Sequence, residues 1–207
     1  MAFEEYDDFE QEQMVKDWIK NNWLTITAGI ALGLGGVVGI NYWKTSQQQK
    51  RFEAATKYEE FTRVMELKEL DDAQSVIAGL KKDFGDNFYT YEGSLLLAKE
   101  FVQNNELDKA AAELQKIVDS KPDKVITEFV KLRLARVKNA LGQNDQALSL
   151  AKSITSDSFS SIAQEILGDA YIAKGDKVNA KAAYQKASEN GEGYSGKRNI
   201  EIKLQNS

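Results

Sequence analysis

The chain has 207 residues and a formal net charge of −5, and it contains no cysteine and no histidine. The missing cysteines exclude disulfides and thiolate metal sites, and the missing histidines remove the commonest general base and metal ligand. One proline and a wealth of Ala, Leu, Lys, Glu and Gln favour helix throughout. We therefore expect an all-α protein large enough for one soluble domain with its own core.

The negative charge is concentrated at the N-terminus. Residues 1–23 carry seven acidic side chains against two basic ones, whereas the remaining chain carries 25 of each sign. A neutral remainder offers no field that attracts nucleic acid, so no nucleic-acid partner is expected. Residues 1–12 are predicted to be an acidic tail that is disordered when alone.

Residues 14–22 can form a short amphipathic helix, because Met14, Val15, Trp18 and Ile19 share one face at helical spacing. This helix is either a juxtamembrane extension of the segment that follows or a docking helix for a partner. Its acidic surroundings argue against adhesion to an anionic lipid surface. We treat residues 1–22 as one N-terminal region, made of the tail and this helix.

Residues 23–43, WLTITAGIALGLGGVVGINYW, are uncharged. A helix of this length spans about 31 Å, the thickness of a bilayer's hydrocarbon core. Trp18, Trp23, Tyr42 and Trp43 lie at or near its ends, as in an aromatic belt. A buried core helix would carry a more polar face, and a cleaved signal peptide would need a basic leader and a small-residue cleavage site. We predict one uncleaved transmembrane helix in the lipid bilayer.

Two Gly-x-x-x-Gly pairs lie within this segment, formed by Gly29 with Gly33 and Gly35 with Gly39. Each pair places two glycines one turn apart, and such a flat face allows close approach of a second helix. The four glycines are the candidate helix-packing face in the membrane. The alternative is that glycine is simply common in membrane helices.

Residues 44–207 repeat a unit of two helices with Asn, Gly or Asp between them. The second helices carry alanines separated by 37, 37 and 33 residues: Ala73, Ala110, Ala147 and Ala180. This pattern resembles the tetratricopeptide repeat, in which small residues let paired helices approach closely. The expected fold is a single N-terminal transmembrane helix followed by a tetratricopeptide-repeat-like α-solenoid of about four helix pairs, closed by a short C-terminal cap after residue 196.

The units match the repeat unevenly. The last unit carries the signature in full, at Leu167, Gly168, Tyr171, Ala180, Tyr184 and Ala187. The unit before it has Lys138 where an aromatic is usual, and the unit around Ala73 is degenerate. The separations of 37 exceed the usual repeat length, which affects the stacking angles expected there.

The first helix of each pair lines the concave face of such a solenoid, where peptides and proteins bind. By the repeat register, the candidate protein-binding residues are Lys99, Val102, Phe129, Leu132, Arg136, Asn139, Glu165 and Asp169. Alternatively, several of them only cover a superhelical surface. They do not reproduce the Lys/Asn/Arg clamp by which some relatives grip a C-terminal carboxylate. A nearby basic cluster, Lys131, Arg133, Arg136 and Lys138, should divide between two faces of its helix.

Catalytic patterns are not found. The sequence offers no phosphate-binding loop and no Cys or His for nucleophilic or metal chemistry. Acidic pairs such as Glu59-Glu60 and Asp71-Asp72 fit solvated faces or helix starts. We expect no enzyme activity, no catalytic or metal residues and no cofactor.

Three local runs carry a closer resemblance: NELDKAAAELQ from Asn105, LRLARV from Leu132 and GDK-x-x-A-x-x-A from Gly175. With the acidic leader and the single anchor, the chain resembles the YfgM family of gammaproteobacterial inner-membrane proteins over its whole length. The resemblance implies an ancillary subunit of the SecYEG translocon, partnered with the membrane-anchored chaperone PpiD. It implies a non-enzymatic adaptor that helps transfer secretory client chains to periplasmic chaperones.

The same resemblance implies a cytoplasmic N-terminus and a periplasmic repeat domain. The charges point the other way, since Lys16 and Lys20 precede the anchor and Lys44, Lys50, Arg51 and Lys57 follow it. Long domains translocate largely regardless of such charges, so we expect the family orientation. The alternative function is a membrane-tethered signalling or assembly scaffold that acts through its acidic cytoplasmic leader.

Overall fold

The computed structural model describes residues 8–189 and 196–206. Residues 1–7 of the predicted acidic tail and most of the predicted loop before residue 196 therefore lie outside the described residues. Residues 8–12, which the sequence predicted to be disordered, are helical instead. The chain divides into two compact units, Met1–Glu53 and Ala54–Ser207. The domain limits predicted at residues 22 and 43 stay predictions, and the helix that contains them runs through both without a break.

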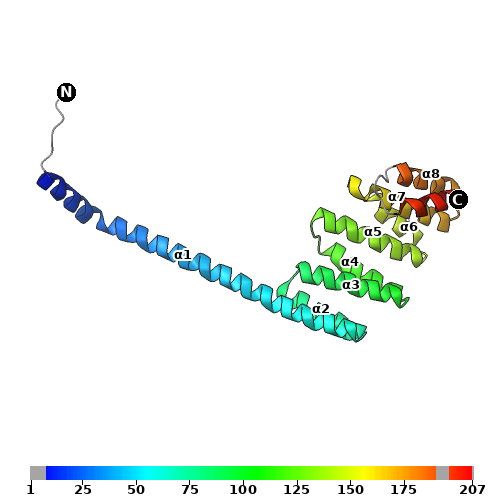
Figure 1. The fold of residues 1–207 in the computed structure, drawn as a ribbon, viewed down its shortest axis with the longest axis horizontal. Coiled ribbons are helices and arrows are strands. Elements are labelled where there is room, and N and C mark those ends of the chain that lie inside the picture. The colour runs from blue at the N-terminus through cyan, green and yellow to red at the C-terminus, as the bar shows by residue number, and fades with distance from the viewer. Residues whose placement is uncertain (1–7, 190–195, 207) are drawn as a thin grey trace, which may run out of the picture. The chain divides into compact units, whose positions relative to one another are not determined.

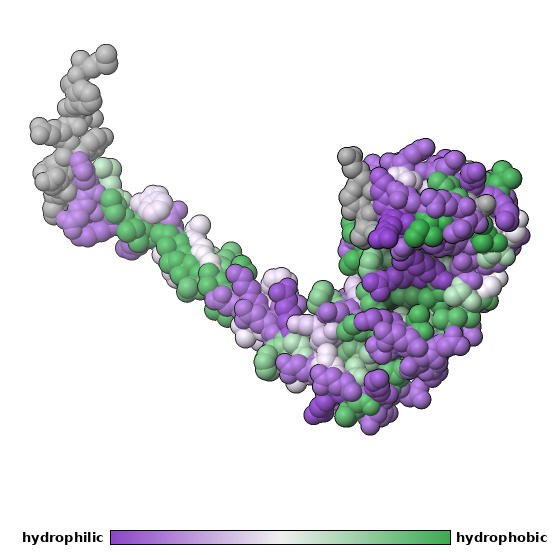
Figure 2. Space-filling model, turned by 45° about the vertical axis from the view of Figure 1, so that its right-hand side comes forward, coloured by the Kyte–Doolittle hydropathy of each residue, from purple (hydrophilic) through white to green (hydrophobic). Residues whose placement is uncertain are grey.

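That helix is α1 (Asp8–Glu66), and its apolar portion is the candidate membrane span. None of the apolar window is buried, and Trp18, Trp23 and Trp43 are each about 60% exposed. Figure 2 shows hydrophobic side chains gathered along this helix. The Thr27 hydroxyl donates to the carbonyl of Trp23 at 2.7 Å, so this polar group is satisfied within the helix. These features fit a helix surrounded by lipid.

The second unit is an array of four helix pairs followed by a cap, as predicted (Figure 1). The C-terminal turns of α1 pair with α2 (Leu70–Phe84), through a shared core and an ion pair between Lys57 and Asp83. The later pairs are α3 (Phe88–Gln103) with α4 (Leu107–Asp119), α5 (Lys124–Ala140) with α6 (Asn144–Lys152), and α7 (Ser160–Ala173) with α8 (Lys177–Glu189). A 3-10 turn (Asp157–Phe159) precedes α7, and α9 (Lys197–Gln205) is the cap. The described residues contain no strand.

The same turn joins the two helices of every pair. One residue in each turn has a positive φ between 61° and 79°: Lys68, Asn105, Gly142 and Gly175. The following N–H donates to the carbonyl five residues earlier, for example from Glu106 to Phe101 at 2.7 Å and from Gln143 to Lys138 at 2.8 Å. This is the Schellman ending of a helix, which glycine and asparagine favour. The repeated Asn and Gly signals therefore mark one recurring turn.

The four register alanines, at positions 73, 110, 147 and 180, are all 0% exposed. All four belong to the buried clusters of the repeat domain, as the predicted alanine spacing requires. Larger side chains fill the spaces between them, among them Phe61, Phe101, Leu97 and Leu134. The cap closes the last pair with Ile200, which is 0% exposed and packs in one cluster with Tyr184.

Candidate protein-binding groove

A groove runs between the first helices of the second and third pairs, and we call it the α3–α5 groove. It has an empty volume of about 590 Å³, part of which is open solvent. Its lining residues are Leu95, Ala98, Lys99, Val102 and Gln103 on α3, Leu114 on α4, and Arg133, Arg136 and Val137 on α5. The spacing of three and four residues along each helix brings these side chains to one face.

The floor of the groove is apolar and its rim is basic. Ala98, Leu114 and Val137 are buried parts of the domain core, so the core fixes the floor in place. Lys99, Arg133 and Arg136 provide the rim, and no acidic residue is among the described residues that line the groove. The arrangement suits non-covalent binding of a partly apolar chain.

The Arg133 guanidinium is held against the Phe129 ring, with 4.5 Å between Cζ and the ring centroid. Partial burial, and then the neighbouring charge of Arg136, lower the pKa of Arg133. Arg136 makes one long contact to Glu165, at 3.4 Å between Nη2 and Oε2. Neither Lys99 nor Arg133 has an ion pair with any described residue. The rim therefore carries positive charge that the domain itself does not neutralise.

The eight candidate residues from the sequence lie in different environments in the structure. Lys99, Val102 and Arg136 line the groove, and Phe129 supports Arg133 from below. Leu132 is 3% exposed and belongs to the core that α5 shares with α7, so its side chain lines no surface. Asn139 is half-buried, and its Oδ1 has no hydrogen-bond partner among the described residues.

Glu165 and Asp169 are held by the cap. Lys203 Nζ lies 2.7 Å from Glu165 Oε1 and 2.8 Å from Asp169 Oδ1. The Tyr184 hydroxyl donates to Asp169 at 2.8 Å. Burial opposes the charge on Lys203, but hydrogen bonds to Asp169 and Glu165 raise the pKa of Lys203 above its usual value. At this end of the face, the acidic groups are engaged within the domain.

Arg133, Gln103 and Leu114 belong to the groove although they are not among the candidate residues from sequence. Arg133 lies three residues before Arg136, and that spacing on a helix is the signal that could have found it. The predicted division of the basic cluster is confirmed. Lys131 bonds to the Ser153 hydroxyl at 3.2 Å and Lys138 bonds to Gln143 at 2.8 Å, while Arg133 and Arg136 share the groove.

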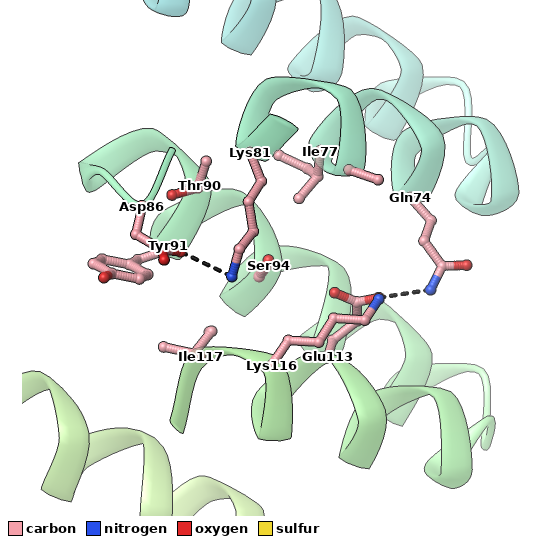
Figure 3. A pocket seen from close by; sticks show the side chains of 11 residues that line it. Gln74, Ile77, Lys81, Asp86, Thr90, Tyr91, Ser94, Glu113, Lys116 and Ile117 are labelled. Carbon is pink, nitrogen blue, oxygen red and sulfur yellow. Dashed lines mark hydrogen bonds and ion pairs between the residues drawn. The ribbon is translucent and has the colours of Figure 1, made fainter. Parts of the chain in front are cut away.

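A second pocket lies between α2, α3 and α4 (Figure 3). Its polar groups bind one another. Lys81 pairs with Asp86 at 2.9 Å, and buried Glu113 pairs with Lys116 at 2.6 Å and accepts a hydrogen bond from the Gln74 amide at 2.6 Å. A buried carboxylate with two partners is satisfied by the fold itself. We therefore interpret this pocket as part of the packing between the first and second helix pairs.

The four glycines of the membrane segment, Gly29, Gly33, Gly35 and Gly39, have open space around them, since a Cβ atom at any of them would meet nothing within 4 Å. The helix-packing face therefore stays a prediction. Among the described residues, no group of three acidic side chains is placed to hold a metal ion.

Comparison with known proteins agrees with the architecture. A family model for the tetratricopeptide repeat-like domain matches residues 16–207. A protein of Haemophilus influenzae is 34% identical over 88% of this chain and 90% of its own length, and one of Escherichia coli is 32% identical over 85% and 84%. A third, from Aggregatibacter actinomycetemcomitans, is 32% identical over 95% and 97%. All three are named "Ancillary SecYEG translocon subunit". The chain therefore belongs to the YfgM family of Sec-associated inner-membrane proteins with a tetratricopeptide repeat-like domain.

Proposed function

We propose that this protein is a non-enzymatic, membrane-anchored adaptor at the SecYEG translocon that helps transfer newly translocated chains to periplasmic chaperones. In this proposal the repeat domain lies in the periplasm and the N-terminus in the cytoplasm. A PpiD-type membrane-anchored chaperone is its partner, and secretory client chains and periplasmic chaperones contact the repeat domain.

The observation that carries the proposal is the α3–α5 groove. It combines a preformed apolar floor with a basic rim, in which Lys99 and Arg133 make no ion pair with a described residue, on the face where helical repeats bind other chains. The groove belongs to a chain that also holds a candidate membrane span, and relatives over most of its length are named as translocon subunits. A surface for polypeptide on a membrane-anchored translocon subunit supports an adaptor role.

Site-specific photocrosslinking in intact membranes tests the proposal. The crosslinking residue replaces Val102, which is 43% exposed in the groove, while cells are secreting a pulse-labelled protein. The matched control replaces Val178, which is 81% exposed on α8 and does not line the groove. We expect position 102 to capture a translocon subunit, a secretory chain or a periplasmic chaperone, and position 178 to capture them less. Equal capture, or none at either position, would refute the proposed role of the groove.

The orientation has its own test. Alkaline phosphatase, which folds only where disulfides form, is fused after the last residue. Activity in cells is expected for a periplasmic repeat domain, and an inactive fusion that is nevertheless present at full length would place this domain in the cytoplasm.

A deletion distinguishes the adaptor function from the alternative, a scaffold that acts through the acidic leader. Removal of residues 1–12 should leave crosslinking from position 102 unchanged under the adaptor proposal. Loss of function on that deletion, with the crosslinks intact, would favour the scaffold.

A further inference from the structure

We infer that the α3–α5 groove binds a short acidic, amphipathic segment of a partner protein, whose apolar side chains enter the floor while its carboxylates meet Lys99, Arg133 and Arg136. The inference rests on the proposed function and specifies the chemistry of the chain that the groove accepts. Figure 2 shows hydrophilic and hydrophobic residues interspersed over the surface of the repeat domain. A specific partner is therefore selected by the chemistry of one groove.

The floor accepts apolar side chains without rearrangement. Ala98 and Leu114 are each 2% exposed and belong to the same core as Leu97 and Phe101. Val102 also lines the groove and is 43% exposed, so a ligand can cover it. Its burial by a ligand removes apolar surface from water, and a preformed site avoids the cost of ordering a loop.

The rim selects carboxylates. Arg133 is partly desolvated and already fixed on the Phe129 ring, so little side-chain freedom is lost when it binds a ligand. The neighbouring Arg136 raises the local positive potential, and its 3.4 Å contact to Glu165 is too long for a strong charge-assisted bond. A planar guanidinium binds a carboxylate through two parallel hydrogen bonds, and Lys99 adds a third positive charge across the groove.

The opposite specificity, for a basic segment, would need carboxylates, and none of the described residues that line the groove is acidic. Glu165 and Asp169, on α7, already bind Lys203 of the cap at 2.7 and 2.8 Å. A basic segment would have to displace a cation held by two carboxylates. An acidic segment displaces only water and the long contact of Arg136.

Calorimetric titration of the full chain in a mild detergent tests the inference. The probes are two short synthetic peptides with blocked ends and the same leucine spacing, one with Glu and one with Lys between the leucines. We expect the Glu peptide to bind at least about tenfold more tightly, which corresponds to one charge-assisted contact. Its affinity should fall when salt is raised, because partly exposed charges are screened.

The variants Arg133→Gln and Arg136→Gln should each weaken binding of the Glu peptide about tenfold. The matched controls are Lys131→Gln and Lys138→Gln. They remove the same charge from the same helix at positions that do not line the groove and that bind Ser153 and Gln143 instead. The controls should leave the affinity unchanged. Equal affinity for the two peptides, equal effects of all four variants, or displacement of the Glu peptide by vesicles of anionic lipid would overturn the inference.

Failure here is distinct from failure of the proposed function. If position 102 captures secretory or translocon chains in membranes but the groove shows no acidic preference, the adaptor role stands and only the ligand chemistry is wrong. If the Glu peptide binds as expected but position 102 captures none of those proteins, the groove chemistry stands and the adaptor role is wrong.

Discussion

The ring of Tyr184 fills the space directly over Gly168, so that a Cβ atom at position 168 would lie 2.3 Å from Cε1 and 2.5 Å from Cδ1 of the ring. This contact sets how closely α7 and α8 approach. The ring cannot move aside easily, because Tyr184 is 2% exposed and its hydroxyl donates to Asp169.

Gly168→Ala is therefore expected to destabilise the repeat domain. Overpacking of a filled core costs about 1–3 kcal/mol, and the gain in helix propensity offsets only about 1 kcal/mol of this. Urea unfolding of the full chain in detergent, followed by circular dichroism, measures the change. The control is Gly79→Ala on α2, where a new Cβ would meet only the flexible end of Lys57 at 3.1 Å. That variant should be neutral or stabilising, and an equal loss in both would contradict the contact as the cause.

The contact between Gly168 and Tyr184 also illustrates what the sequence could predict. Alanine spacing and the signature at Gly168 and Tyr184 predict the repeat, the helix pairs and the close approach, because these depend on local periodicity. The partners of Glu165 and Asp169 could not be predicted in this way. They depend on Lys203, which lies more than thirty residues further along the chain and reaches them only after α9 folds back. Side-chain register likewise placed Leu132 on the surface, whereas packing of α5 against α7 buries it.

Replacement of Lys203 by Met tests that link between the cap and α7. Met keeps the length of the side chain but removes the charge, so buried Glu165 loses its 2.7 Å contact to the Lys203 ammonium. Loss of one partner of a mostly buried carboxylate costs about 1–3 kcal/mol. We expect faster hydrogen exchange in α9 and a lower free energy of unfolding. Lys197→Met on the same helix is the control, because Lys197 is exposed and makes no ion pair with a described residue, and it should change neither quantity.

In the turn between α1 and α2, one substitution is expected to stabilise the repeat domain. Lys68 has a φ of 61°, a left-handed conformation that costs a side-chain-bearing residue about 1 kcal/mol, whereas the equivalent positions in the last two pairs are Gly142 and Gly175. Lys68→Gly should raise the free energy of unfolding by up to about 1 kcal/mol. Gly142→Ala, at a φ of 73°, should lower it by a similar amount. If the two changes had the same sign in urea titrations, the strain argument would fail.

Glu128 connects α5 to the segment before α7 and makes stability depend on pH. Its carboxylate accepts hydrogen bonds from the backbone and hydroxyl of Thr155 at 3.1 and 2.9 Å and from the backbone of Ser156 at 3.2 Å. A hydrogen bond from the Ser156 side chain has the largest effect on the pKa of Glu128, and the bonds from Thr155 and the Ser156 backbone add to it. Burial acts in the opposite direction but is outweighed, so the pKa of Glu128 falls from 4.5 to about 2. The ionised form is therefore favoured in the folded protein.

A depressed pKa stabilises the fold above the unfolded value, and that contribution disappears as pH falls through the folded value. At neutral pH, Glu128→Gln should cost about 1–3 kcal/mol, because the charged acceptor is lost. The difference between wild type and variant should shrink as pH falls from about 4.5 to about 2. Urea titrations at a series of pH values measure it, with Glu60→Gln as a control on an exposed carboxylate. A difference that stays constant over this range would show that Glu128 contributes through its shape and not through its charge.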